Sequence, residues 1–137
     1  MGTFTVLLQL ADPENRNHET VEALVDSGAT YTLVPASILE RLGVVPHGSR
    51  RFVLADGSRV ERGFGSTWMR FNGKEDISPV VFWDEDTQPV LGAVTLEIFS
   101  LGIDPVSRRL IDVEALAMAA GPPRGSSMQP FMPAGAR

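Results

Sequence analysis

The chain has 137 residues, which is enough for one domain with a hydrophobic core and small for two lobes. It contains no cysteine and two histidines, which excludes disulfides and thiol catalysis and disfavours a histidine metal cluster, so we expect neither metal nor cofactor. The formal net charge of -5 argues against a nucleic-acid-binding face, which would carry an excess of lysine and arginine.

The apolar stretches of the chain are short. Residues 6–11 lack the basic leader and the long apolar segment of a signal peptide, and no run is long enough to cross a membrane. We therefore expect a cytoplasmic protein that does not insert into a membrane.

The first third of the chain predicts three strands and a helix. Apolar and polar residues alternate along residues 3–10, which predicts a strand with a buried face. A second strand, over about residues 19–25, is expected to return antiparallel to it. Residues 31–34 predict a short buried strand, and a helix of one to two turns follows, with Pro35 in its first turn and Gly43 at its end.

Two hairpins are predicted in the middle of the chain. An Asp-Gly pair lies between extended residues 51–54 and 59–63, and an Asn-Gly pair lies between residues 66–71 and 77–82. Such pairs between extended runs are strong short-range signals for tight hairpin turns. We expect the first hairpin to project from the molecule and the second to supply Trp68 and Phe71 to the core.

The last part of the chain predicts a helix, a strand and a tail. Residues 93–101 predict a helix that Gly102 closes, and residues 108–113 predict a last core strand. The rest is rich in glycine, proline, alanine and methionine, a composition that cannot bury enough apolar surface to order itself. We therefore divide the chain into a domain over residues 1–113 and a flexible tail over residues 114–137.

The candidate catalytic residue is Asp26, at the start of the run Asp26, Ser27, Gly28, Ala29 and Thr30. This order places a carboxylate on a sharp turn directly after a buried strand. The glycine allows a second loop to approach closely, and Ser27 and Gly28 can donate hydrogen bonds to carboxylates. Asp-Ser-Gly is also a common turn tripeptide, and alone it would indicate only a turn. The apolar runs on both sides of it and a matching feature downstream favour the catalytic interpretation.

That downstream feature is the stretch Val90, Leu91 and Gly92. It repeats the order of an apolar strand, a small-residue loop with glycine, and a short helix that a glycine ends. Leu91 stands where the first stretch has Asp26. We interpret the two stretches as a duplicated unit in which only one copy kept the acid.

With these residues the sequence resembles the retropepsin-like aspartic proteases, particularly the small single-domain bacterial kind, over about residues 4–113. The resemblance implies an all-β, closed barrel-like fold with one or two short helices, one lobe per chain, and a homodimer. It implies that Ser27 braces the opposite loop of the dimer and that a flap closes over an extended polypeptide substrate. The flap candidates are Leu54, Ala55, Asp56, Gly57 and Ser58.

The dimer also follows from chemistry. Aspartic proteases need two carboxylates that share a proton, and this chain has one such motif. A symmetric homodimer would bring Asp26 against its own copy, so that one carboxylate acts as general base on a water while the other protonates the peptide carbonyl. Viral members place an acid after the alanine and pair it with an arginine after the second glycine. This chain has Thr30 and Ala93 there, so both charges are missing together.

Two other functions compete with an aspartic endopeptidase. The first is a catalytically silent domain that kept the fold and its groove for binding or assembly, since a fold does not guarantee activity. The second is a serine hydrolase that uses Ser27, which lacks a histidine placed to act as its base. A monomer in solution would favour the silent binding domain.

Overall fold

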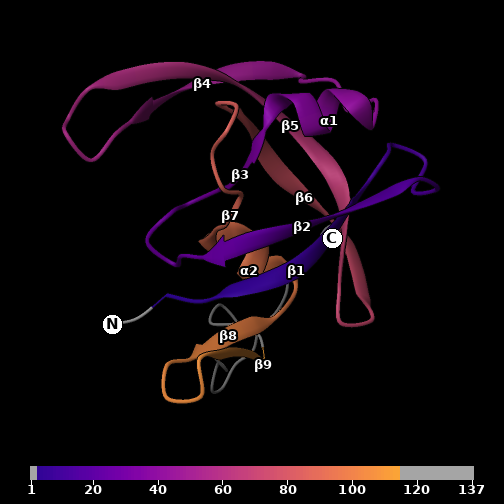
Figure 1. The fold of residues 1–137 in the computed structure, drawn as a ribbon, viewed down its shortest axis with the longest axis vertical. Helices are drawn as coiled ribbons and strands as arrows, with labels where there is room; N and C mark the ends of the chain where they lie inside the picture. Colours follow the sequence, from indigo (N-terminus) through magenta and orange to yellow (C-terminus); the bar gives the residue numbers. More distant parts are fainter. Residues whose placement is uncertain (1–2, 115–137) are drawn as a thin grey trace, which may run out of the picture.

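The computed structural model describes residues 3–114, and strands dominate them (Figure 1). This confirms the predicted all-β class with two short helices within the described part of the chain. In chain order the elements are β1 (Thr5–Ala11), β2 (His18–Val25), β3 (Thr32–Pro35), α1 (Ala36–Arg41), β4 (Gly48–Val53), β5 (Arg59–Phe71), β6 (Lys74–Trp83), β7 (Val90–Leu91), α2 (Ala93–Ile98), β8 (Leu101–Asp104) and β9 (Arg109–Asp112).

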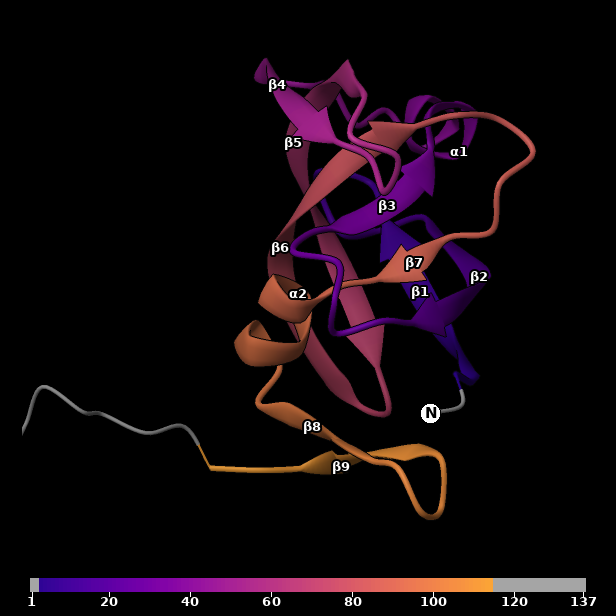
Figure 2. The ribbon, with the colours of Figure 1, turned by 90° about the vertical axis from the view of Figure 1, so that its left-hand side faces the viewer.

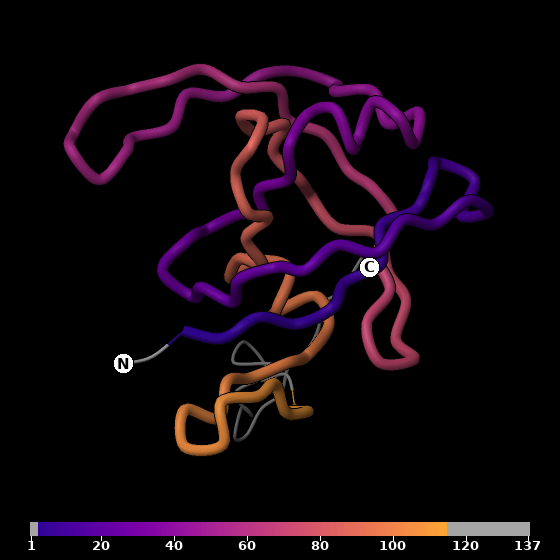
Figure 3. Tube along the Cα trace, viewed as in Figure 1, coloured from indigo at the N-terminus to yellow at the C-terminus, as the bar shows by residue number. Residues whose placement is uncertain are grey.

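Seven of these strands form one curved sheet in the order β1-β2-β7-β3-β6-β5-β4. Because β1 also pairs with β5, the sheet returns on itself as a ring. β1 and β2 are antiparallel, as predicted, whereas β2 and β7 run parallel. The trace in Figure 3 shows that the β4–β5 hairpin projects from the body of the molecule.

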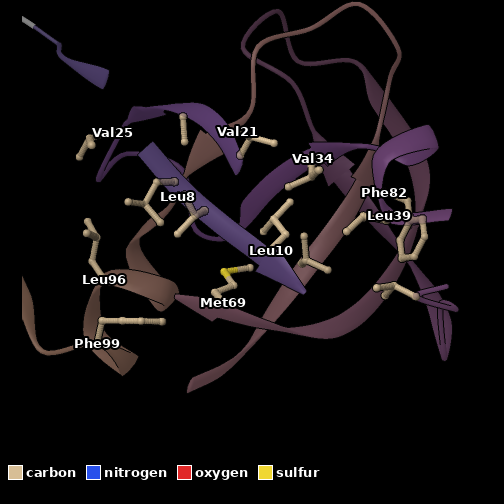
Figure 4. Packing of buried hydrophobic residues seen from close by; sticks show 14 residues of the cluster. Leu8, Leu10, Val21, Val25, Val34, Leu39, Met69, Phe82, Leu96 and Phe99 are labelled. Atoms are coloured by element: carbon tan, nitrogen blue, oxygen red, sulfur yellow. The ribbon is translucent and has the colours of Figure 1, made fainter. Parts of the chain in front are cut away.

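The hydrophobic core fills the ring (Figure 4). Strand alternation directs every second residue inward, and a fully buried leucine or valine side chain stabilises the fold by about 1.5–3 kcal/mol. Met69 supplies bulk from β5, whereas Trp68 is half-buried and lies outside the core cluster. The prediction for Trp68 was therefore wrong, because Thr67 and Met69 occupy the inward positions of this strand.

β5 is one strand of 13 residues where the sequence predicted two. It pairs with β4 as far as Phe64 and with β6 from Phe64 onward, so the change of partner requires no break. Gly63 and Gly65 lie at this junction. A Cβ atom on Gly63 would lie 3.3 Å from Pro46, and one on Gly65 would lie 3.3 Å from Phe82. These glycines thus allow close packing and do not end the strand.

The C-terminal elements also differ from the prediction. α2 ends at Ile98, and Ser100 takes the left-handed conformation with φ 53°, so that Gly102 lies inside β8. β9 pairs only with β8, in a separate two-stranded sheet below the main body in Figure 2, and its residues are largely exposed. The predicted last core strand is therefore part of a peripheral hairpin. The predicted tail lies outside the described residues except for Glu114.

Both predicted hairpin turns are confirmed. Gly57 has φ +88° at the tip of the first, and Asn72 and Gly73 have φ values of 53° and 84° at the second. These are the left-handed conformations that tight hairpin turns require, and glycine and asparagine adopt them at least cost. Gly43, with φ +80°, follows α1 as expected.

Candidate active site

Asp26 directly follows the last residue of β2, and hydrogen bonds fix its position. Its N–H donates to the carbonyl of Leu91 (3.0 Å), and its own carbonyl accepts from the N–H of Ala29 (3.1 Å). One carboxylate oxygen accepts from the N–H of Gly28 at 2.9 Å. The side chain is exposed. The loop thus presents a carboxylate in a defined orientation to the surface.

The second predicted stretch lies directly against this loop. The N–H of Ala93 donates to the carbonyl of Ala29 (2.8 Å), and the N–H of Val94 donates to that of Thr30 (2.9 Å). A Cβ atom on Gly92 would lie 2.5 Å from the carbonyl oxygen of Tyr31, so no other residue fits there without a backbone shift. The two loops are therefore joined by backbone contacts, with no charged pair at the positions where viral members carry one.

A groove of about 570 Å³ brings the Asp26 loop together with the predicted flap. Its lining includes both charged and apolar side chains. The lining residues are Asp26, Gly28, Ala29, Thr30, Tyr31, Leu33, Arg51, Phe52, Val53, Leu54, Ala55 and Trp83. Most of the predicted catalytic-loop residues and the first two flap residues thus share one groove.

The remaining predicted flap residues form the tip of the β4–β5 hairpin. The N–H of Leu54 donates to the carbonyl of Ser58 (2.8 Å), and the N–H of Gly57 donates to that of Leu54 (2.9 Å). Asp56 accepts from the Ser58 hydroxyl (2.6 Å) and the Ser58 N–H (2.9 Å). These bonds lower the pKa of Asp56. The ionised carboxylate therefore stabilises the turn at any pH above the ordinary pKa of an aspartate, and this stabilisation is lost as the pH falls through the lowered pKa.

Three aromatic side chains, Tyr31, Phe52 and Trp83, line the groove and form an aromatic wall that was not predicted from the sequence. Tyr31 meets Phe64 edge to face, with ring centroids 4.9 Å apart, and Phe52 meets Trp83 in the same way at 6.2 Å. Arg50, on the flap strand β4, donates to the Tyr31 hydroxyl at 2.8 Å. Phe52 in β4 and Leu54 directly after its end are two residues apart, and that alternation in the sequence was the signal that could have found Phe52. Trp83 ends its strand without any such signal.

Ser27 and the second stretch do not line this groove. Val90, Leu91 and Gly92 lie behind the catalytic loop, where Leu91 belongs to the core. Ser27 lines a smaller hollow of about 280 Å³ beside Asp26. Its other walls come from the residues before β1, the end of β2 and the β8–β9 hairpin, and are Thr3, Phe4, Val25, Ile103 and Pro105.

Residues 3–114 contain neither a cluster of metal-ligating side chains nor a helix that could span a membrane. No three histidine, aspartate or glutamate side chains in this range converge as metal ligands would. The two helices of this range have six residues each, so neither is long enough to span a membrane.

Comparison with known proteins identifies the family. The family model described as aspartyl protease matches residues 14–95, which include the catalytic loop, the flap and the second stretch. The chain therefore belongs to the aspartyl protease family. Among curated protein sequences, none matches the chain.

The fold is that of the retropepsin-like members. The retroviral protease-like domain of Ddi1 from Leishmania major is 21% identical with a TM-score of 0.51, and the match covers 80% of this chain and 88% of that domain. A retropepsin-like aspartic protease from Rickettsia conorii is 22% identical with a TM-score of 0.50, and the match covers 76% of this chain and 86% of that protein.

Proposed function

We propose that the chain is an aspartic endopeptidase that acts as a symmetric homodimer, with Asp26 of each copy in one active site. The observation that carries this proposal is the position of Asp26. Its carboxylate is exposed, its backbone is fixed by the neighbouring loop, and it lies in the groove that Leu54 and Ala55 of the predicted flap also line. Family membership supports the same reaction.

The chemistry requires a second carboxylate. Asp26 is the only acidic residue that lines the groove within the described part of the chain. A second copy related by a two-fold axis supplies it, because such a contact brings the same residue from both chains together. The hollow beside Ser27 offers a surface for this contact, since it combines the apolar side chains of Phe4 and Ile103 with the exposed edge of the catalytic loop.

In this dimer the two carboxylates hold one proton between them, since like charges in contact cannot both ionise. The ionised carboxylate removes a proton from water as the water oxygen attacks the peptide carbonyl carbon. The protonated carboxyl donates its proton to the carbonyl oxygen. When the tetrahedral diol collapses, the C–N bond breaks, one diol hydroxyl returns its proton to the ionised carboxylate, and the nitrogen takes the proton held by the other carboxyl.

The substrate is a polypeptide in extended conformation. The groove runs between the catalytic loop and β4, and an extended chain placed there can form backbone hydrogen bonds in the manner of an added strand. The aromatic wall of Tyr31, Phe52 and Trp83 provides apolar surface for its side chains.

The test is cleavage of a mixture of unstructured peptides between pH 4 and pH 7, followed by mass spectrometry. We expect Asp26→Asn to abolish the cuts, a loss of at least about 10⁴-fold by analogy with other essential catalytic groups. Glu97→Gln, an equivalent change at an exposed position on α2, is expected to leave every cut in place.

Two results would contradict the proposal. Cuts that persist in Asp26→Asn would exclude Asp26 as the catalytic residue. A folded dimer that cuts nothing would favour the silent binding domain instead.

A further inference from the structure

Three buried hydroxyl side chains lie behind the catalytic loop and take no part in the groove. Thr32 is on β3, Ser78 on β6 and Thr95 on α2, and their exposed fractions are 0%, 0% and 2%. The Thr32 and Thr95 oxygens are 2.6 Å apart, and the Ser78 and Thr95 oxygens are 2.7 Å apart. Figure 2 shows α2 beside the strands that carry the other two residues.

Two backbone groups terminate this row of hydroxyls. The N–H of Gly92 donates to the Thr32 hydroxyl at 3.0 Å, and the Ser78 hydroxyl donates to the carbonyl of Pro79 at 3.1 Å. A backbone N–H can only donate, and a carbonyl can only accept. The two ends therefore determine the direction of every bond between them.

The direction follows one residue at a time. Ser78 gives its single proton to Pro79, so it must accept from Thr95. Thr95 has then used its proton and must accept from Thr32. Thr32 donates to Thr95 and accepts from Gly92. Each buried hydroxyl thus donates once and accepts once, in one unbroken chain from Gly92 to Pro79.

The origin of this chain is the residue that supports the catalytic loop. Gly92 lies between Leu91, whose carbonyl accepts the Asp26 N–H, and Ala93, whose N–H donates to Ala29. It also contacts the backbone of Tyr31, the residue before Thr32. The hydroxyl chain therefore fixes the segment to which the catalytic loop is bonded.

We infer that Thr95, together with Thr32 and Ser78, is a positioning residue for Asp26, acting through Gly92 and not through contact with substrate. This inference deepens the proposed function and rests on it. Thr95 is the central member, since its loss leaves Thr32 without an acceptor and Ser78 without a donor, both in a buried environment.

The test compares two variants at Thr95. Thr95→Val keeps the shape of the side chain and removes the hydroxyl, whereas Thr95→Ser keeps the hydroxyl. We expect Thr95→Val to lower kcat on the order of 10- to 100-fold, because small misplacements of catalytic groups have effects of this size, with KM nearly unchanged. Thr95→Ser is expected to restore kcat close to that of the natural protein.

Thr67→Val is the matched control. The Thr67 hydroxyl is also buried, and it donates to the carbonyl of Ala11 at 2.6 Å, away from the catalytic loop. The control also removes a buried hydroxyl, with one hydrogen bond lost against the two lost in Thr95→Val, so we expect it to lower the melting temperature and to leave kcat unchanged. Equal losses of kcat in the two variants would overturn the inference.

A second readout does not depend on proteolysis. Amide hydrogen exchange, followed by NMR, reports on the N–H groups of Asp26, Ala93 and Val94, which bond the two loops together. We expect these amides to exchange faster in Thr95→Val and at the natural rate in Thr67→Val. Should Thr95→Val not fold, Ser78→Ala at the end of the row serves in its place, with the same expected change in exchange.

The two readouts separate the possible failures. If the natural protein cuts no peptide, the proposed function fails and the exchange rates alone decide the inference. If it cuts peptides through Asp26 and Thr95→Val retains both kcat and amide protection, the inference fails and the proposed function stands.

Discussion

The loop after β2 and the loop after β7 lie side by side and share a pattern of residues, yet their surroundings are opposite. The first exposes Asp26, Ser27 and Gly28, whereas the second buries Leu91 and Gly92. The first has a side chain available for chemistry. The second fills the space beneath it with apolar surface and donates or accepts the backbone bonds that fix the first. One loop thus exposes the carboxylate that we propose to be reactive, and the other supports the backbone of that loop.

The largest expected effect comes from making the second loop like the first. Leu91→Asp would place a carboxylate where the natural side chain is 2% exposed within the core. Burial of an unpaired charge costs about 4–5 kcal/mol or more, which is comparable to the whole stability of many domains. We expect the variant to be unfolded by circular dichroism. A variant that folds with a second active carboxylate would show that the two loops are interchangeable.

A smaller change to the supporting loop is Gly92→Ala. The added methyl group would meet the carbonyl oxygen of Tyr31 at 2.5 Å and that of Ala29 at 2.9 Å, both of them backbone atoms that must shift. Overpacking of this kind costs about 1–3 kcal/mol. We expect a lower urea midpoint together with a large loss of activity. Unchanged stability would mean that the contact between the loops is loose.

The equivalent change in the exposed loop is Gly28→Ala. Here the methyl group would lie 3.1 Å from the carboxylate oxygen of Asp26, a side-chain atom that can move aside. We expect stability to change by less than about 0.5 kcal/mol, as at most surface positions, while kcat falls because the carboxylate is displaced.

The control for Gly28→Ala is Gly48→Ala at the base of the flap, where no atom lies within 4 Å of the added methyl group. Gly48→Ala is expected to change neither the free energy of unfolding nor kcat. A drop in unfolding free energy for Gly28→Ala as large as that for Gly92→Ala would contradict the distinction between a reactive and a supporting loop.

Much of the fold could be predicted because local signals and tertiary structure agree. Strand alternation located β1 and β2, and the Asp-Gly and Asn-Gly pairs located both hairpin turns. The predictions failed where tertiary contacts overrode a local signal. Residues 59–63 and 66–71 were predicted as two separate strands, yet β5 is continuous because β6 replaces β4 as its partner at Phe64.

The candidate site shows the same division. The turn that exposes Asp26 and the hairpin at residues 54–58 could be predicted from short motifs, because a turn that presents a carboxylate and a hairpin tip both need particular residues. The aromatic wall could not, since Tyr31, Phe52 and Trp83 come from three separate segments that only the closed ring brings together. The hydroxyl row was missed for the same reason, because Thr32 and Thr95 are far apart in sequence.

The unbroken course of β5 has a mechanical consequence. One end of the strand carries the flap, and the other end carries Met69 in the core and pairs with β1. The strand therefore links the hairpin to the core without a break, and at Gly63 and Gly65 it packs closely against Pro46 and Phe82. If a peptide binds in the groove as proposed and immobilises the hairpin, we expect β5 and the core around it to become more rigid as well.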